Sequence, residues 1–338
     1  MKKICIILLI ILPSLPVISQ QVTKVGTTAA NFLLVGAGAR AVGMGSAFVA
    51  VSNDITAMYW NPAGITRINQ SQAMFSHAKW FADISHNYAG VIVPIQNFGT
   101  LGIHASFMNM GTMERTTIAQ PDGTGETFTA GSYALGISYA RSLTDRFAIG
   151  FNGKYLSEQI YHSTARGIAF DIGTLFQTRL NGMNLGMSIA NYGTKMRMSG
   201  RDMLLQADID PLIEGNNENL NAYLDTDAYD LPLIFRVGVS MDVLKGIANS
   251  NLIISMDALH PNNDKEYMNV GCEYSFQQMV FLRGGYKTLW LTDSQEGLSL
   301  GAGLAYRLPT GIALQLDYCY QDFGYLNDIQ MFSLIFSF

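Results

Sequence analysis

The sequence has 338 residues, of which only 14% are charged, against about a quarter in ordinary soluble proteins. Aromatic residues reach 11%, and there are 33 glycines. Little charge with many aromatic residues and glycines is typical of a wall that faces lipid on one side. The formal net charge is −5, which argues against a nucleic-acid partner, because phosphate binding requires clustered lysines and arginines.

The amino terminus is predicted to be a cleaved secretory signal peptide, residues 1–19. Two lysines precede an apolar run from Ile4 to Leu12, and the small residue Ser19 offers a cleavage point. The run is too short to cross a membrane as a helix, and no later stretch has the roughly 18 uninterrupted apolar residues that a membrane helix needs. We therefore expect an exported protein and, if it spans a membrane, one that does so with strands.

A glycine-rich stretch from Phe32 to Gly64 follows and differs from the rest of the chain. Its notable residues are Gly36, Gly38, Gly43 and Gly45, the charged pair Arg40 and Asp54, and the closing Asn61 and Pro62. Glycines at this density indicate tight turns or a backbone pressed closely against another element.

The first part of this stretch imitates a dinucleotide-binding fingerprint. Gly36 and Gly38 begin a G-x-G-x-x-A pattern after an apolar run, and Asp54 lies at a plausible distance beyond it. The fingerprint requires a βαβ unit in a parallel sheet, which the remaining chain does not supply. No nucleotide site, and no other cofactor, is therefore predicted.

Residues 20–70 are instead predicted to form a compact plug inside a barrel. A barrel of about fourteen strands is wide enough to need filling or to form a pore. Arg40 and Asp54 are candidates to pair with each other or with charges of the barrel interior. The alternative, that both side chains are simply solvated, stays open at this point.

Residues 71–338 alternate between apolar and small or polar residues. Leu298, Leu300 and Leu304 share one parity, whereas Ser299 and Gly301 share the other. This period of two indicates strands with two different environments, and in a transmembrane barrel the apolar face meets lipid while the other lines the lumen. Charges fall on the polar parity in strand after strand. A soluble β-sandwich would instead have apolar inner faces and densely charged outer faces.

The alternation predicts an all-β fold, an antiparallel transmembrane barrel of about 14 strands, an even number as in bacterial outer membranes. The expected strands are 71–80, 86–96, 99–111, 128–142, 145–159, 164–178, 182–193, 231–243, 250–259, 266–277, 279–291, 295–308, 310–322 and 328–338. Tight turns mostly alternate with longer connections, which matches short periplasmic turns and longer outer loops. Cys272 and Cys319 fall on opposite parities, so no disulfide between them is expected.

The run VGAGARAVGMGSAFVAVSNDITAMYWNPAGI, within Phe32–Ile65, resembles the opening signature of the PorV/PorQ family, which is related to FadL-type barrels. In that family the turn that here is Asn61-Pro62-Ala63 ends the amino-terminal segment before the first strand. The resemblance implies an outer-membrane barrel of a Gram-negative, Bacteroidetes-like bacterium, with outer-membrane lipid around it. It also implies a link to type IX secretion, in which the best-known members hold or shuttle secreted cargo beside the translocon.

Two functions remain open. The first is a non-enzymatic secretion component that binds or hands over secreted cargo to protein partners of the secretion machinery. The alternative is a FadL-like channel for hydrophobic small molecules, which requires a continuous apolar pocket beside the plug; the small, polar lumen parity favours the first. The connection 194–230 is acidic and is expected to be a solvated loop, with a cap over the barrel or a partner contact as the functional alternatives. It lacks the spacing of a calcium loop.

Catalysis and metal binding are not predicted. The sequence contains neither a G-x-S-x-G nor an H-E-x-x-H motif. Its histidines are scattered along the chain: His77, His86, His104, His162 and His260.

Overall fold

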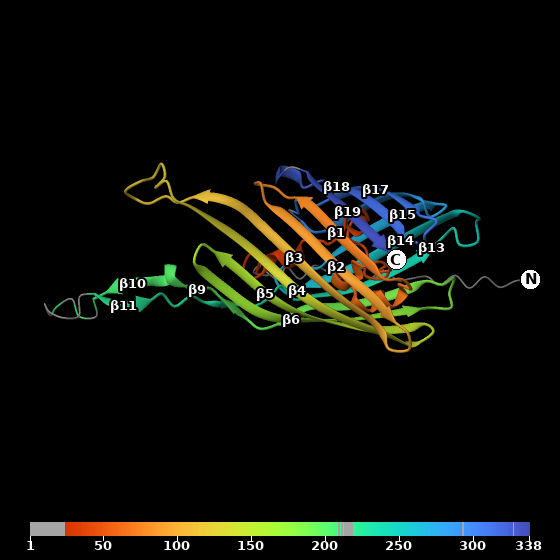
Figure 1. The fold of residues 1–338 in the computed structure, drawn as a ribbon, viewed down its shortest axis with the longest axis horizontal. Helices are drawn as coiled ribbons and strands as arrows, with labels where there is room; N and C mark the ends of the chain where they lie inside the picture. Colours follow the sequence, from red (N-terminus) through yellow and green to blue (C-terminus); the bar gives the residue numbers. More distant parts are fainter. Residues whose placement is uncertain (1–23, 209, 211, 213–218, 293, 327) are drawn as a thin grey trace, which may run out of the picture.

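The computed structural model describes residues 24–208, 210, 212, 219–292, 294–326 and 328–338. The expected signal peptide and part of the acidic run, including Glu214 and Glu218, lie outside these residues. Figure 1 shows the ribbon of the chain, a strongly tilted barrel of antiparallel strands. Among the described helices, none is long and apolar enough to cross a membrane, a finding that does not bear on β-barrels.

Fourteen strands of the described chain form the closed wall. They are β1 (Gln72–Lys79), β2 (Ser85–Ile95), β3 (Gly99–Glu114), β4 (Thr127–Thr144), β5 (Phe147–Ile160), β6 (Ser163–Gln177), β7 (Asn184–Gly193), β13 (Ile234–Asp242), β14 (Ser250–Pro261), β15 (Tyr267–Phe276), β16 (Val280–Leu289), β17 (Leu298–Arg307), β18 (Ala313–Gln321) and β19 (Ile329–Ser337). Each pairs antiparallel with its neighbours, and β1 pairs with β19, for example Phe75 opposite Leu334, which closes the ring. The predicted fold class and strand number are confirmed.

The alternation in the sequence becomes the two faces of the wall. In β6 the side chains of Ile168, Phe170 and Ile172 are about half exposed on the outside, whereas Ala169 and Asp171 between them are buried. One charge on the lipid side at mid-bilayer would cost ~2–4 kcal/mol, so this sorting is what a lipid-facing wall requires.

The two cysteines obey the same rule. Cys272 is exposed and Cys319 is buried, and both are free. The expectation that they point to opposite faces and form no disulfide is confirmed.

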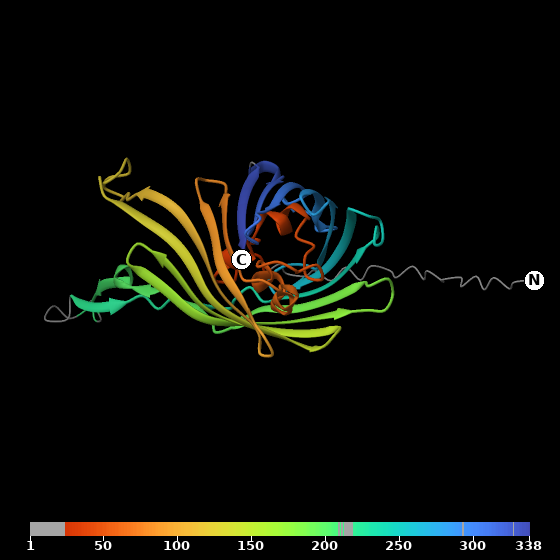
Figure 2. The same ribbon diagram turned by 45° about the vertical axis from the view of Figure 1, so that its right-hand side comes forward.

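The wall is taller on one side than on the other. Strands β3 to β6 have 14 to 18 residues, whereas β15 to β19 have 9 or 10. A strand needs about 9–11 residues to cross the bilayer, so β3 to β6 extend beyond it. They extend at the end of the barrel that carries most of the long connections (Figures 1 and 2). We call this end the outer rim, because long loops of such barrels face outward, and the opposite end the periplasmic rim.

The described part of the connection between β7 and β13 contains five short strands. They are β8 (Met196–Arg197), β9 (Ser199–Gly200), β10 (Leu204–Ala207), β11 (Leu220–Tyr223) and β12 (Ala228–Tyr229), with the 3-10 turn η3 (Arg201–Met203). β10 and β11 form a hairpin that extends away from the barrel at the outer rim (Figure 1). The described part of the acidic connection therefore contains short paired strands.

Residues 24–71, the N-terminal segment, lie inside the barrel (Figure 2). The segment contains η1 (Asn31–Leu34), α1 (Ala39–Gly43), α2 (Ala57–Trp60) and η2 (Pro62–Arg67). α1 packs against β16 to β19, and η2 packs against β3 to β6. The segment thus touches opposite sides of the wall.

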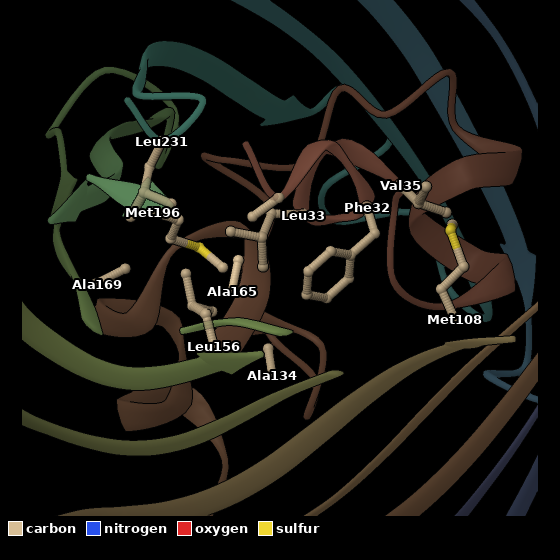
Figure 3. Close-up of a cluster of buried hydrophobic side chains, with 11 residues drawn as sticks. Phe32, Leu33, Val35, Met108, Ala134, Leu156, Ala165, Ala169, Met196 and Leu231 are labelled. Atoms are coloured by element: carbon tan, nitrogen blue, oxygen red, sulfur yellow. The ribbon is translucent and has the colours of Figure 1, made fainter. Parts of the chain in front are cut away.

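Apolar side chains hold this arrangement together. Phe32, Leu33 and Val35 of the segment pack in one cluster with wall residues such as Met108 and Leu156 (Figure 3). Burying a side chain of this size contributes about 1.5–3 kcal/mol, so the interior of the barrel has a core of its own.

Candidate functional site: the N-terminal segment and the cavity beside it

The glycines of the segment let its backbone lie directly against the wall. A Cβ atom added to Gly43 would lie 3.1 Å from the Cα atom of Gly301 in β17. Gly45 has a φ of +63°, and a Cβ there would lie 2.5 Å from the backbone nitrogen of Tyr286 in β16. Gly36 and Gly38 lie between η1 and α1, where Cβ atoms would meet Trp60 and Thr56. All four predicted glycines therefore lie where space is short.

Arg40 is buried and joins the segment to the wall. Its Nη1 donates to Oδ2 of Asp54 at 2.9 Å, and its Nε and Nη2 donate to Oε2 and Oε1 of Glu273 in β15 at 2.8 and 2.7 Å. Burial alone would lower the pKa of Arg40, but the carboxylates of Glu273 and Asp54 outweigh it and raise that pKa above its ordinary value. The structure brings Arg40 and Asp54 together and adds a lumen carboxylate.

The ion pairs continue along the wall. Arg283 in β16 donates from Nε to Oε2 of Glu273 at 2.6 Å and from Nη1 to Oδ1 of Asp317 in β18 at 2.7 Å. Asp54 also accepts hydrogen bonds from the backbone nitrogen and the hydroxyl of Thr56. Each of the three carboxylates in this ion-pair cluster, Asp54, Glu273 and Asp317, thus accepts at least one hydrogen bond. The cluster links α1 to the strands β15, β16 and β18.

Asn61 and Pro62 form the turn at the other end of the segment. The Asn61 amide donates to the carbonyl oxygens of Val49 and of Thr174 in β6, at 2.9 and 3.0 Å, and its Oδ1 accepts from the backbone nitrogen of Ala63. Pro62 begins η2, where a missing N–H costs nothing. The turn lies before β1, as in the family pattern.

A cavity of about 820 Å³ lies between the segment and the outer rim. Its apolar lining comes mainly from the segment and from outer connections, and includes Phe32, Tyr59, Trp60, Trp80, Phe81, Ile84, Leu291 and Phe323. The rings of Trp80 and Phe323 are 5.3 Å apart. The sequence predicts a small, polar lumen from strand positions alone, but these side chains give the cavity an apolar surface.

Arg236 of β13 is the unusual member of this lining. It is 3% exposed and lies over the rings of Tyr59 and Trp60, with its Cζ 5.8 and 5.7 Å from their centroids. Its Nε and Nη1 are buried and have no hydrogen-bond partner among the described residues. The sequence places Arg236 in the lumen but gives no sign of this isolation.

A second, polar cavity of about 370 Å³ lies at the periplasmic rim. Asn53 and Arg67 of the segment line it together with Asp242 of β13 and Lys245 of the turn that follows. No described residue lines both cavities. The segment therefore lies between two separate spaces. Among the described residues, no group of three or more histidines, cysteines, aspartates or glutamates is placed to hold a metal ion.

The fold resembles several solved structures. The Pseudomonas putida toluene transporter TodX has a TM-score of 0.55 and 11% identity, with 89% of this chain and 97% of that chain covered. For the Ralstonia pickettii toluene transporter TbuX the TM-score is 0.54 and the sequence identity 11%, with 90% of this chain and 98% of that chain covered. For a Pseudomonas aeruginosa FadL homologue the TM-score is 0.50 and the sequence identity 12%, with 88% of this chain and 97% of that chain covered.

None of the curated proteins compared with this chain matches it. The sequence profile of a protein family, described as type IX secretion system protein PorV, matches residues 18–198, which is more than half of the chain. That range contains the glycine-rich stretch, the Asn61-Pro62 turn and the first seven strands of the wall, β1 to β7. The chain therefore belongs to the PorV family of type IX secretion proteins, and it is an outer-membrane β-barrel with a FadL-like fold.

Proposed function

We propose that this protein is a non-enzymatic component of type IX secretion that binds secreted cargo and translocon partners and hands the cargo over. Its action is binding at the outer rim, with no chemistry at a side chain. The observation that carries this proposal is the β10–β11 hairpin, which extends from the barrel and exposes Leu204, Leu220 and Tyr223. Exposed apolar residues on an extended loop are typical of a protein contact.

In this proposal residues 20–70 act as a plug, residues 71–338 as the barrel, and residues 1–19 as a signal peptide that is cleaved on export to the outer membrane. Gly36, Gly38, Gly43 and Gly45 bring the plug close to the wall. Arg40, Asp54, Asn61 and Pro62 hold it there. The two separate cavities support a closed lumen, so that the outer loops, and not a pore, carry the function.

Gentle detergent extraction at native expression, followed by mass spectrometry of co-purifying proteins, tests the proposal. Stoichiometric type IX secretion proteins or secreted cargo are expected with the native chain. A variant with residues 204–223 replaced by a short Gly-Ser linker should lose them. Replacement of residues 116–125, in the connection between β3 and β4, serves as the matched control. If the variant without the hairpin retains every partner, the outer hairpin is not the binding surface.

A second candidate is a channel or carrier for hydrophobic small molecules. The apolar 820 Å³ cavity beside the segment favours it, because such a volume is within the range of small-molecule sites, about 300–1,000 Å³. TodX and TbuX, which share this fold, are toluene transporters. A lone barrel that co-purifies with a bound hydrophobic molecule and without protein partners would favour this candidate.

A further inference from the structure

The polar cavity of about 370 Å³ at the periplasmic rim contains a guanidinium without an acid beside it. Arg67, the last residue of η2, donates from Nη2 to Oδ1 of Asn184 in β7 at 2.8 Å. Its Nη1 donates to the carbonyl oxygens of Ala50 and Val51 at 3.2 and 3.1 Å. All of these acceptors are neutral. Burial lowers the pKa of Arg67, and no carboxylate of the described chain offsets this effect.

Lys245 adds a second positive charge to the same lining. It lies in the turn after β13, with its Nζ 2.7 Å from the place that a Cβ of Gly182 would take. Asp242 of β13 is the one acid of the described lining, and its Oδ1 accepts the backbone N–H groups of Leu244 and Leu252. No ion pair of the described chain joins Asp242 to either cation. Two cations and one carboxylate give this lining a net charge of +1, in a chain of formal net charge −5.

Two amide side chains of the lining are oriented by arginines. Oδ1 of Asn53 accepts from Nη1 of Arg40 at 2.7 Å, and Oδ1 of Asn184 accepts from Nη2 of Arg67. An arginine can only donate, so each amide presents its oxygen to the arginine and keeps its NH₂ group for another acceptor. The cavity therefore combines an excess of positive charge with amide donors, a combination that suits an anion.

The charge and the size of the cavity favour a carboxylate over a phosphate. One excess positive charge balances a monoanion, whereas a phosphate group carries about −1.5 to −2 at pH 7 and would be repelled more strongly by Asp242. The volume of about 370 Å³ lies near the lower end of the range for small-molecule sites, about 300–1,000 Å³. That space suits a small acid or one acidic side chain.

We propose that this cavity binds a carboxylate group presented from the periplasm, with Arg67 and Lys245 as its cationic partners. The carboxylate belongs to a small free acid or to a glutamate or aspartate side chain of a peptide, and the test below distinguishes the two sources. The site shares no described residue with the apolar cavity. It also lies at the opposite rim from the β10–β11 hairpin, so it is independent of both functions considered above (Figure 1).

The test uses the full chain in nanodiscs of phosphatidylcholine, which has no net charge, and saturation-transfer NMR of small ligands. The matched probes are the capped tripeptide acetyl-Ala-Glu-Ala-amide and its neutral analogue with glutamine, together with acetate and inorganic phosphate. Charged hydrogen bonds predict that the glutamate peptide binds about 10- to 100-fold more tightly than the glutamine peptide. Acetate that competes as well as the peptide identifies a small free acid as the ligand, whereas weaker competition identifies a peptide side chain.

Arg67 also holds the backbone of the segment, so the exposed Lys245 is the residue to change. Lys245→Gln should weaken binding of the preferred carboxylate about 2- to 5-fold, as expected for an exposed cation. Asp242→Asn should strengthen it, because the negative charge is lost while an oxygen remains for Leu244 and Leu252. Arg146→Gln, at an exposed position of the periplasmic rim outside the cavity, makes the same change in net charge as Lys245→Gln and should have no effect.

Three results would overturn the proposal. The first is equal binding of the glutamate and glutamine peptides, or no binding of any carboxylate, by the native chain. The second is tighter binding of phosphate than of every carboxylate. The third is an equal loss of binding in Lys245→Gln and Arg146→Gln, which would show that the net charge of the rim, and not this cavity, attracts the ligand.

Discussion

Replacing Arg40 by methionine tests how the N-terminal segment is held inside the barrel. Methionine keeps much of the length and apolar volume of the side chain but removes the charge and all three donors. The change leaves Asp54 with the hydrogen bonds of Thr56, and it leaves Oε2 of Glu273 with Arg283. Oε1 of Glu273 loses the Nη2 donor of Arg40, and no other described residue donates to it.

The expected loss of stability follows from the hydrogen bonds that Asp54 and Glu273 keep and lose. Removing one partner of a buried ion pair costs about 3–5 kcal/mol, because the other charge stays buried without compensation. The side chains of Arg40 and Glu273 are 11% and 3% exposed, so water replaces little of the lost interaction. Since Arg283 still neutralises Glu273 in part, the value should lie near the lower end, about 3 kcal/mol.

The loss is measured as a shift in the midpoint of guanidinium unfolding in detergent, with chymotrypsin cleavage in the segment as a local readout. Arg40→Met should unfold at lower denaturant and expose Phe48 and Tyr59 to cleavage. Combining it with Glu273→Gln should restore part of the stability, because the unpaired charge is then gone. The exposed pair of Arg115 with Glu126 gives the control, since Arg115→Met should cost at most about 1 kcal/mol. If Arg40→Met and Arg115→Met behave alike in both assays, the ion-pair cluster does not hold the segment.

Three further predictions concern the close contacts and the two faces of the wall. Gly43→Leu should destabilise the barrel by about 1–3 kcal/mol in the same unfolding assay, because the new side chain would overlap Gly301. Ile137→Arg, at an outward side chain that is 66% exposed, should lower stability in lipid by ~2–4 kcal/mol, as measured by folding into vesicles. A lipid-soluble maleimide should label Cys272 in the intact membrane protein and spare Cys319, as read by mass spectrometry.

Each of these has a control in the same chain. Gly153→Ala faces outward with its nearest neighbour at 3.7 Å and should fold normally. Ile118→Arg, in an outer connection with its side chain fully exposed, should be neutral. Denatured protein should be labelled at both cysteines. The assigned packing is contradicted if Gly43→Leu is no more destabilising than Gly153→Ala, or if Ile137→Arg is no more destabilising than Ile118→Arg. Labelling of Cys319 in the folded protein would also contradict it.

The wall can be predicted from the sequence because lipid and lumen impose a period of two on every strand. In β6, a shift by one residue would turn Ile168, Phe170 and Ile172 into the lumen and Ala169 and Asp171 outward. The carboxylate of Asp171 would then lie in lipid. Strand ends are less certain: β3 continues to Glu114, past the expected 111, because the outer parts of the tall strands pair with each other beyond the membrane. There the lipid no longer dictates the pattern.

The cavity and the ion-pair partners cannot be predicted in the same way. Glu273 is 233 positions from Arg40, and only closure of the barrel brings the two together. Trp80 and Phe323 belong to two connections that meet because β1 and β19 are neighbours in the ring. The isolation of Arg236 is a property of its surroundings, since its place in the alternation is the same as that of the well-paired Arg283.

The path of the N-terminal segment constrains the order of assembly. Ala29 donates its backbone N–H to Asp230 and Thr28 contacts Asn263, both in connections at the outer rim, whereas β1 begins at the periplasmic rim. The segment therefore runs the length of the lumen and passes directly into β1, whose other edge pairs with the last strand. The pairing of β1 with β19 thus closes the barrel around the N-terminal segment of the same chain. Pairing of β1 with β19 around a segment already in place avoids threading that segment lengthwise through a closed barrel. We therefore expect this pairing to form after the segment has packed against the wall.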